Sequence, residues 1–161
     1  MTEVSGKIDL KGRVAIVTGG ARGIGQAICL ALAREGAAVV VADVIDGAET
    51  AGAIVGRGGR AMYVPTDVTS RSQVEALVER VKAELGTVHI LVNNAGTLQR
   101  VGLEKTTDEL WERDVGTIMR GTFLCTQAVY PVMKAQGYGK IVNISSISLP
   151  LPFREGGWGV R

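Results

Sequence analysis

The sequence has few of the residues that build metal centres and covalent cross-links. Its 161 residues include two cysteines and one histidine. Cys29 and Cys125 fall within separate helical patterns at core-like positions, so they predict neither a disulfide framework nor a metal site. His89 stands alone at the start of an apolar strand pattern, and we expect it at the surface or in a turn. This use of cysteine favours a reducing, cytoplasmic compartment.

Long apolar runs and runs of one charge are also missing. No apolar stretch is long enough to cross a bilayer, and residues 1–12 lack the apolar core of a secretory signal. The net charge is only +2, and the basic residues are interspersed with acidic ones and accompanied by few aromatics. A membrane anchor and a nucleic-acid partner are therefore not expected.

Apolar residues and glycines are abundant: 46% of the residues are hydrophobic and 22 are glycines. This composition and length indicate one globular domain. The sequence is organised around the glycine-rich stretch from Thr18 to Gly25. The β-branched run Val14–Val17 before it predicts a buried parallel strand, and apolar residues at helical spacing from Ile24 to Leu32 predict a helix after it.

Three glycines in this stretch suit different tasks in a phosphate-binding turn. Gly19 permits a tight turn after the strand, Gly23 lets the backbone approach a phosphate, and Gly25 allows close packing of helix on strand. A pyrophosphate would then lie at the positive end of the helix dipole. The alternative is a glycine-rich turn that binds no ligand.

Asp43 ends a second buried strand pattern, Ala37–Asp43, and lies 18 residues after Gly25, close to the spacing of the acid that binds an adenosine ribose. Its alternative role is a helix cap or turn residue. A carboxylate here favours NAD, because it would repel the 2′-phosphate of NADP. Arg22, a potential phosphate partner, argues weakly for NADP.

The remaining pattern completes an alternation of strands and helices. Further strands are predicted at 61–65, 88–92 and 140–144, and further helices at 47–55, 74–85 and 117–135, with a helix start at 106–109. We expect Pro131 to kink the last helix or mark its late portion. The fold class is therefore α/β, a Rossmann-like doubly wound parallel sheet with strand order 3-2-1-4-5.

Two polar groups follow later strands of this predicted sheet. Asp67, after the third strand, could bind an adenine amino group or could simply be a turn residue, and Thr69 or Ser70 would cap the next helix. Asn93–Gly96, after the fourth strand, supplies amides and space beside a flat ligand. We expect these groups to meet the glycine turn and Asp43 at the carboxyl edge of the sheet.

These motifs together resemble the short-chain dehydrogenase/reductase family over about residues 10–148. The resemblance rests on Thr18–Gly25, Asp43, Asp67-Val68, Asn93–Gly96 and Ile141–Ser146. It implies NAD binding, with NADP less favoured, and the following cofactor contacts: Gly19, Arg22, Gly23, Ile24, Gly25, Asp43, Asp67, Val68, Asn94, Ala95 and Gly96.

The family transfers a hydride between a nicotinamide and an alcohol or ketone, using a serine, a tyrosine, a lysine four residues later and often a helix asparagine. Ser146 matches the serine, whereas Ile118 occupies the asparagine position. Trp158 stands at the spacing of the tyrosine, and an indole does not titrate usefully. The lysine position and the family's last strands would lie beyond residue 161, so the chain resembles a C-terminally truncated member.

These features predict an NAD(P)-dependent oxidoreductase fold that lacks the tyrosine–lysine acid/base pair and is inactive alone. We expect a dinucleotide-binding domain over residues 1–148 and an irregular tail over 149–161. An alternative is a non-catalytic dinucleotide-binding or partner-binding module; FAD or another nucleotide is a weaker alternative. A family-like homo-oligomer would have an incomplete interface, because the uncovered helix and the fifth strand would expose apolar area.

Overall fold

The structure is a computed structural model that describes residues 8–97 and 101–145. Strands and helices alternate as expected. In chain order they are β1 (Val14–Thr18), α1 (Gly23–Arg34), β2 (Ala38–Asp43), α2 (Ala48–Val55), β3 (Arg60–Pro65), α3 (Arg71–Leu85), β4 (Ile90–Asn93), the short 3-10 helix η1 (Leu103–Lys105), α4 (Asp108–Val115), the π-helical turn η2 (Gly116–Arg120), α5 (Gly121–Ala135) and β5 (Lys140–Asn143).

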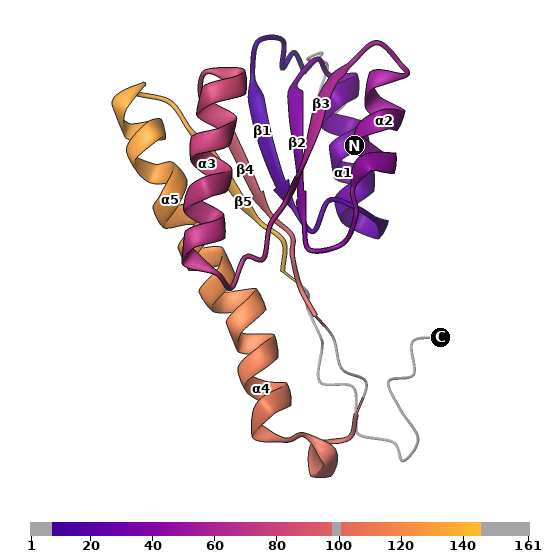
Figure 1. Ribbon diagram of the computed structural model, residues 1–161, viewed down its shortest axis with the longest axis vertical. Coiled ribbons are helices and arrows are strands. Elements are labelled where there is room, and N and C mark those ends of the chain that lie inside the picture. The colour runs from indigo at the N-terminus through magenta and orange to yellow at the C-terminus, as the bar shows by residue number, and fades with distance from the viewer. Residues whose placement is uncertain (1–7, 98–100, 146–161) are drawn as a thin grey trace, which may run out of the picture.

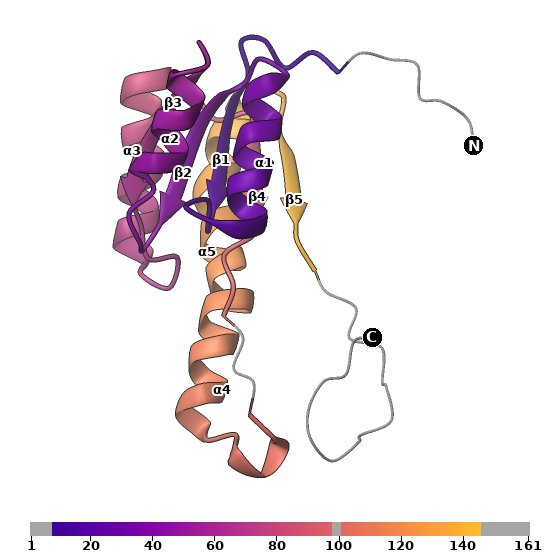
Figure 2. The ribbon, with the colours of Figure 1, turned by 90° about the vertical axis from the view of Figure 1, so that its right-hand side faces the viewer.

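The five strands form one parallel sheet in the order β3-β2-β1-β4-β5. This confirms the predicted fold class and strand order. Helices α1 and α2 cover one face of the sheet, and α3 and α5 cover the other (Figures 1 and 2). The order reverses between β1 and β4, so the carboxyl ends of these central strands form the crevice where doubly wound sheets bind ligands.

The core consists of two clusters, one on each face of the sheet. Alternate residues of the central strands supply both, because successive side chains of a strand point to opposite faces. Ile16 and Leu91 pack with α3 and α5, whereas Val17 and Val92 pack with α1 and α2. Every residue of β1 is buried, as expected for a strand covered on both sides.

The long helix differs from the prediction. It begins at Asp108 rather than near residue 117, because the predicted helix start and the predicted helix belong to one helical run made of α4, η2 and α5. The hydroxyl of Thr107 accepts the N–H of Leu110 and caps its start. Pro131 lies near the end of α5, where it removes one helical hydrogen bond close to the terminus.

The edge formed by β5 and the long helix exposes apolar side chains, as predicted. All four residues of β5 are exposed, including Val142 at 46%. Trp111, Met119 and Phe123 of the helix are also more than half exposed. None of the described helices is both long enough and apolar enough to span a membrane.

Candidate functional site

The glycine-rich turn after β1 has a geometry that requires glycine. Gly19 and Gly23 have φ of +65° and +57°, in the region that side chains with a Cβ disfavour. A Cβ on Gly19 would lie 2.9 Å from the Cα of Ala95, and a Cβ on Gly25 would collide with the Gly19 carbonyl oxygen. The turn therefore packs tightly against both β4 and α1, while the space before Gly23 is open, with no atom within 4 Å of its Cβ position.

The start of α1 presents backbone N–H groups without a side-chain cap. Arg22 precedes the helix in an extended conformation and makes no capping hydrogen bond. Arg22, Gly23 and Ile24 are all exposed. Uncapped N–H groups and the helix dipole favour an anion at this position.

Asp43 reaches from the end of β2 to the glycine turn. Its Oδ2 accepts the Ala21 N–H at 3.0 Å, and its Oδ1 accepts the Ile45 N–H at 3.2 Å. The side chain is half-buried. Each carboxylate oxygen keeps a second lone pair for a ligand, so the same group can shape the turn and bind a hydroxyl.

A second support of the turn comes from α2 and was not predicted. The buried Thr50 donates its hydroxyl to the Ala21 carbonyl at 2.9 Å and accepts the Gln26 side-chain amide at 3.0 Å. Together with Asp43, it fixes both polar backbone groups of Ala21. The only sequence signal was a threonine at an inward-facing position of a predicted helix.

Thr18 and Asn94 join the carboxyl ends of β1 and β4. The Thr18 hydroxyl donates to the Val92 carbonyl and accepts the N–H groups of Asn94 and Ala95, both at 3.0 Å. The Asn94 amide donates to the carbonyls of Thr18 and Gly19 at 3.0 and 3.1 Å. Both hydrogens of this amide are therefore used inside the protein, so Asn94 holds the turn against β4. Its predicted contact with a cofactor stays a prediction.

Asp67 forms the turn after β3. Its Oδ1 accepts the N–H and the hydroxyl of Thr69 at 2.8 and 2.7 Å, and no hydrogen bond to another described residue engages its Oδ2. Val68 is buried against Gly121, where a Cβ would lie 2.7 Å from the Val68 side chain. Ser70 occupies the predicted N-cap position of α3, but its side chain makes no capping hydrogen bond, and the Thr69 hydroxyl turns back to Asp67.

Asn93 is the central residue of a polar cluster on the α5 face of the sheet. Its amide donates to Asn143 Oδ1 at 2.9 Å and to the Thr126 hydroxyl at 3.3 Å. Its own Oδ1 is buried and has no hydrogen-bond partner among the described residues. The cluster ties β4, β5 and α5 together, a role that the sequence did not reveal.

The catalytic part of the prediction is only partly described. Ser146 lies outside the described residues, as does the tail at 149–161. Ile118 lies in the π-helical turn, where the Gly121 N–H bonds the Gly116 carbonyl, and a Cβ on Gly96 would lie 3.9 Å from its side chain. The position thus borders the end of β4, and π-helical turns often occur at functional sites.

The two cysteines are core residues, as predicted. Cys29 packs under the turn and Cys125 lies on the opposite face of the sheet. Burial raises the pKa of each thiol to about 12, so neither is a thiolate at neutral pH. Among the described residues, no group of three or more histidine, cysteine or acidic side chains could hold a metal ion.

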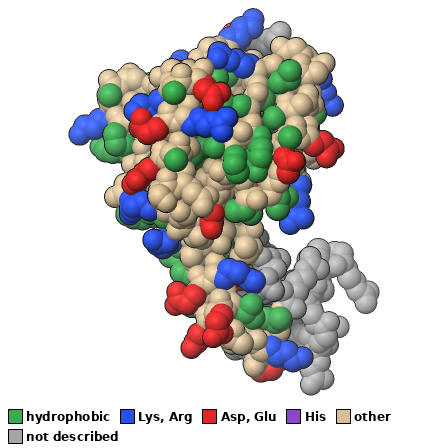
Figure 3. All heavy atoms as spheres, in the orientation of Figure 1, with side chains coloured by type: hydrophobic (Ala, Val, Ile, Leu, Met, Phe, Trp, Pro, Cys, Tyr) green, Lys and Arg blue, Asp and Glu red, His purple; other side chains and the backbone are tan. Residues whose placement is uncertain are grey.

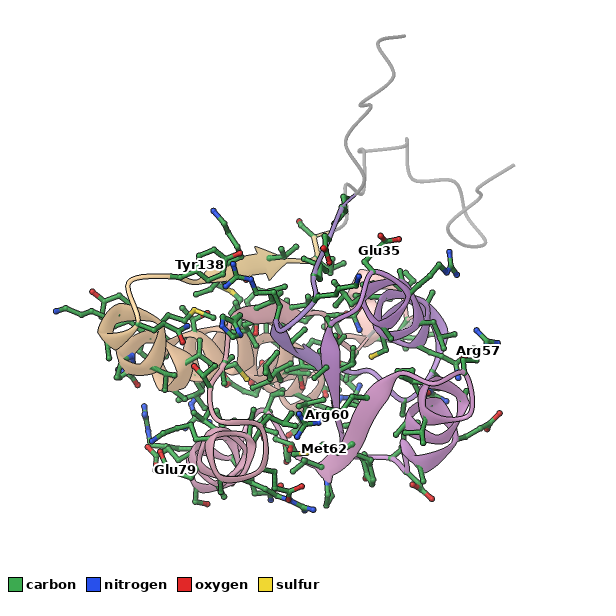
Figure 4. The ribbon with its side chains drawn as sticks, turned by 90° about the horizontal axis from the view of Figure 1, so that it is seen from above. Glu35, Arg57, Arg60, Met62, Glu79 and Tyr138 are labelled. Atoms are coloured by element: carbon green, nitrogen blue, oxygen red, sulfur yellow. The ribbon has the colours of Figure 1, made fainter. Side chains whose placement is uncertain are left out.

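His89 has a structural role at the amino edge of the sheet. Its Nδ1 accepts the Val14 N–H at 3.0 Å, and its ring meets the Tyr138 ring edge to face. Arg13 stacks on the same tyrosine, 4.2 Å from the ring centre; Figure 4 looks onto this edge and shows Tyr138 beside β5. Burial, aided by the charge of Arg13, lowers the pKa of His89.

The predicted groups meet at one edge of the sheet. The glycine turn, Asp43 and residues 94–96 converge at the carboxyl ends of β2, β1 and β4, whereas Asp67 lies at the end of β3. This arrangement suits a dinucleotide, and the sequence model of the short chain dehydrogenase family matches residues 13–155. The chain belongs to the short-chain dehydrogenase family. Members of this family bind NAD or NADP.

Relatives within the short-chain dehydrogenase family share about two-fifths of their residues with this chain. The cis-4-hydroxycyclohexanecarboxylate dehydrogenase of Sinomonas cyclohexanicum is 44% identical over 84% of the chain and 55% of its own length. The acetoacetyl-CoA reductase of Rhizobium meliloti is 43% identical over 84% of the chain and 56% of its own length. The chain thus spans about half the length of these relatives.

A solved structure shows the same short-chain dehydrogenase fold. A protein of Sinorhizobium meliloti 1021, assigned as a short-chain alcohol dehydrogenase, superimposes with a TM-score of 0.81 and 38% identity. The superposition covers 86% of this chain and 56% of the other.

Proposed function

We propose that this chain binds a nicotinamide dinucleotide at the glycine turn, as the cofactor-binding region of an oxidoreductase that acts on an alcohol or ketone. The observation that carries the proposal is the hydrogen bond from the Ala21 N–H to Asp43. It joins the phosphate-binding turn to the carboxylate at the end of the neighbouring strand, so one ligand can contact both.

The residues present fit such a cofactor. The uncapped start of α1 and the open space at Gly23 suit a pyrophosphate. Asp43 suits the ribose hydroxyls, and Asp67 with Val68 borders the adenine end. The exposed side chain of Ile24, with Ala95 and Gly96, borders the remainder of the cofactor. When bound, the nicotinamide supplies hydride transfer.

Asp43 favours NAD over NADP in this proposal. A carboxylate accepts hydrogen bonds from a free ribose hydroxyl and repels a 2′-phosphate, which carries nearly two negative charges at neutral pH. Arg22, exposed in the turn, is the nearby cation that works in the opposite direction. We expect the carboxylate to prevail because its orientation is fixed by two backbone hydrogen bonds.

The residues of the proposed dinucleotide site are present, whereas several positions that the family uses for catalysis carry other residue types. Ser146 matches the serine of the family, but Ile118 replaces the asparagine amide with a hydrocarbon and Trp158 occupies the spacing of the tyrosine. A hydrocarbon cannot position a water, and an indole supplies no acid or base near neutral pH. We therefore expect these 161 residues to bind the dinucleotide without turning it over.

Titration with NADH, followed by nicotinamide fluorescence and thermal melting, tests the proposal. We expect saturable binding that raises the melting temperature, because the ligand binds only the folded state. Asp43→Asn keeps an acceptor for the turn but removes the charge, and should weaken NADH binding about tenfold or more. Asp108→Asn makes the same change at the start of α4 and should leave affinity unchanged. Absence of saturable binding, or equal affinities in the two variants, would contradict the proposal.

A further inference from the structure

A cavity outside the proposed dinucleotide site lies along the first half of the long helix. Its volume is about 300 Å³, and its wall is formed by residues of α4 and η2 and by Val101 from the segment before α4. Several of the helical residues are spaced by three, four and seven positions, which places them on one face of the helix: Trp111, Asp114, Val115 and Ile118. In Figures 1 and 2, α4 extends away from the sheet, and none of its residues is buried. The cavity is therefore separate from both core clusters.

Most of the lining of this cavity is apolar and accessible to a ligand. Trp111, Ile118 and Met119 all line it and are 62%, 45% and 67% exposed. A hydrocarbon that covers this indole and the two other apolar side chains removes apolar surface from water, which lowers the free energy. The cavity therefore favours a ligand with a hydrocarbon body over one that is polar throughout.

Among the described residues that line the cavity, Asp114 is the only charged one. Its Oδ1 accepts the Thr97 hydroxyl and lies 3.6 Å from Nε of Arg113. That separation is too long for a hydrogen bond and both side chains are partly exposed, so Arg113 neutralises the carboxylate only weakly. No hydrogen bond from a described residue engages Asp114 Oδ2. The carboxylate can therefore accept a hydrogen bond from a ligand in the cavity.

A carboxylate in an apolar wall selects a ligand by its charge. An anion would be repelled, and an uncharged hydrocarbon would cover the carboxylate without pairing it, which costs free energy. An ammonium would donate to Asp114 and also be attracted to the ring face of Trp111. The two side chains can act on the same cation, because residues three apart on a helix are neighbours.

We propose that this cavity binds a small apolar amine in its ammonium form. The charge lies at Asp114 and Trp111, and the hydrocarbon lies against Val115 and Ile118. The site is distinct from the proposed dinucleotide site, because its described lining includes no residue of the glycine turn and none of residues 94–96. Amine binding therefore goes beyond the proposed function and does not depend on it.

Tryptophan fluorescence can measure binding at this cavity. The chain has two tryptophans, so in the variant Trp158→Phe all indole emission comes from Trp111. This protein is titrated with cyclohexylamine at pH 7.5, where an alkyl amine is protonated, and with cyclohexanol and cyclohexanecarboxylate at equal ionic strength. We expect the amine to saturate the signal with a dissociation constant of about 1–10 mM. Cyclohexanol should bind about fivefold more weakly, and cyclohexanecarboxylate should not saturate the signal.

Two matched substitutions on α4 test the role of the carboxylate. Asp114→Asn keeps an acceptor for the Thr97 hydroxyl and removes the charge, and it should weaken cyclohexylamine binding about fivefold. Asp108→Asn removes one charge from the same helix outside the described lining of the cavity, and it should change the affinity less than about twofold. Melting temperatures measured alongside show whether each variant is folded. The comparison of the three ligands needs no substitution in the cavity.

Four outcomes would overturn the inference. Absence of saturation by cyclohexylamine, whether the signal stays constant or changes linearly, shows that no site is filled. Equal affinities for cyclohexylamine and cyclohexanol show that the charge of the ligand plays no part. An unchanged amine affinity in folded Asp114→Asn places the binding elsewhere, and an equal loss in Asp108→Asn assigns it to the net charge of the helix.

Titration with NADH separates this inference from the proposed function. Saturable NADH binding without amine binding overturns the amine site and supports the dinucleotide site. Saturable amine binding that is lost in Asp114→Asn, without NADH binding, supports the amine site and contradicts the proposed function.

Discussion

Strands β1 and β5 belong to the same parallel sheet but differ in their burial and in their place in the sheet. β1 is buried over its whole length between two strands and two helical layers. Within residues 8–97 and 101–145, β5 pairs with β4 alone, and all of its residues are exposed. Residues 15–17 of β1 pair with β4 on one side and β2 on the other. The strand that carries the glycine turn is therefore supported on both edges and on both faces.

The difference shows which part of this chain is stabilised by contacts within the chain itself. The region around β1 has both core clusters, the Thr18–Asn94 clamp and the Asp43–Ala21 bond. The β5 edge and the long helix expose apolar area; on the face visible in Figure 3, acidic, basic and hydrophobic side chains are interspersed. We therefore expect stability and dinucleotide binding to depend on β1 and its neighbours and only weakly on β5.

The largest expected effect comes from truncating matched isoleucines. Ile16 of β1 is fully buried, whereas Ile141 of β5 is 37% exposed. Ile16→Ala should cost about 2–5 kcal/mol of unfolding free energy, because it removes buried methyl groups and leaves a cavity. Ile141→Ala should cost less than about 1 kcal/mol. Urea unfolding followed by circular dichroism measures both, and equal losses would show that β5 is as well supported as β1.

A smaller effect is expected at the carboxyl end of β1. Thr18→Val keeps the shape of the side chain but leaves the N–H groups of Asn94 and Ala95 without their acceptor. The expected cost is about 1–3 kcal/mol, with weaker NADH binding because the turn loosens. Thr122→Val is the matched control, since that hydroxyl donates only to the Ile118 carbonyl within the long helix. A loss in the control as large as in Thr18→Val would refute the clamp.

The smallest effect is expected at the amino end of β1, as a dependence on pH. His89 accepts the Val14 N–H only while Nδ1 is unprotonated. Its pKa is lower in the folded chain than in the unfolded one, so the unfolded state binds more protons and stability falls as pH drops below about 6.5.

The expected loss at pH 5.5 relative to pH 7.5 is at most about 1 kcal/mol, the value of one hydrogen bond. Since the chain has one histidine, chemical unfolding at the two pH values isolates this group from other histidines. His89→Asn places an amide oxygen where Nδ1 lies and cannot titrate, so its stability should change less over the same range. The same pH dependence in both proteins would assign the change to other groups.

The sequence was most informative where a feature is local. The glycine turn carries its own geometry in three glycines, and Asp43 follows at a fixed spacing, so both could be predicted together with the strand order. The long helix was misplaced at its start because the π-helical turn at Gly116–Arg120 interrupts the 3.6-residue spacing. Gly121 could have indicated that this helix packs closely on another segment, because its Cβ position lies 2.7 Å from the side chain of Val68.

The supports of the site could not be predicted, because they join distant parts of the chain. Thr18 and Asn94 are 76 positions apart, and Val14 and His89 are 75 apart. Nothing in either local pattern identifies its partner. His89 was therefore expected to be a surface or turn residue, and Asn94 a ligand contact, although both hold β1 against the chain that forms β4.

The two buried thiols are built-in probes of local unfolding, one on each face of the sheet. Cys29 belongs to the cluster beneath the dinucleotide turn and Cys125 to the cluster beneath the long helix. Because both side chains are buried, an alkylating reagent reaches each thiol only after its own layer opens. The labelling rates of the two cysteines therefore time the opening of each face of the sheet separately, without any added probe.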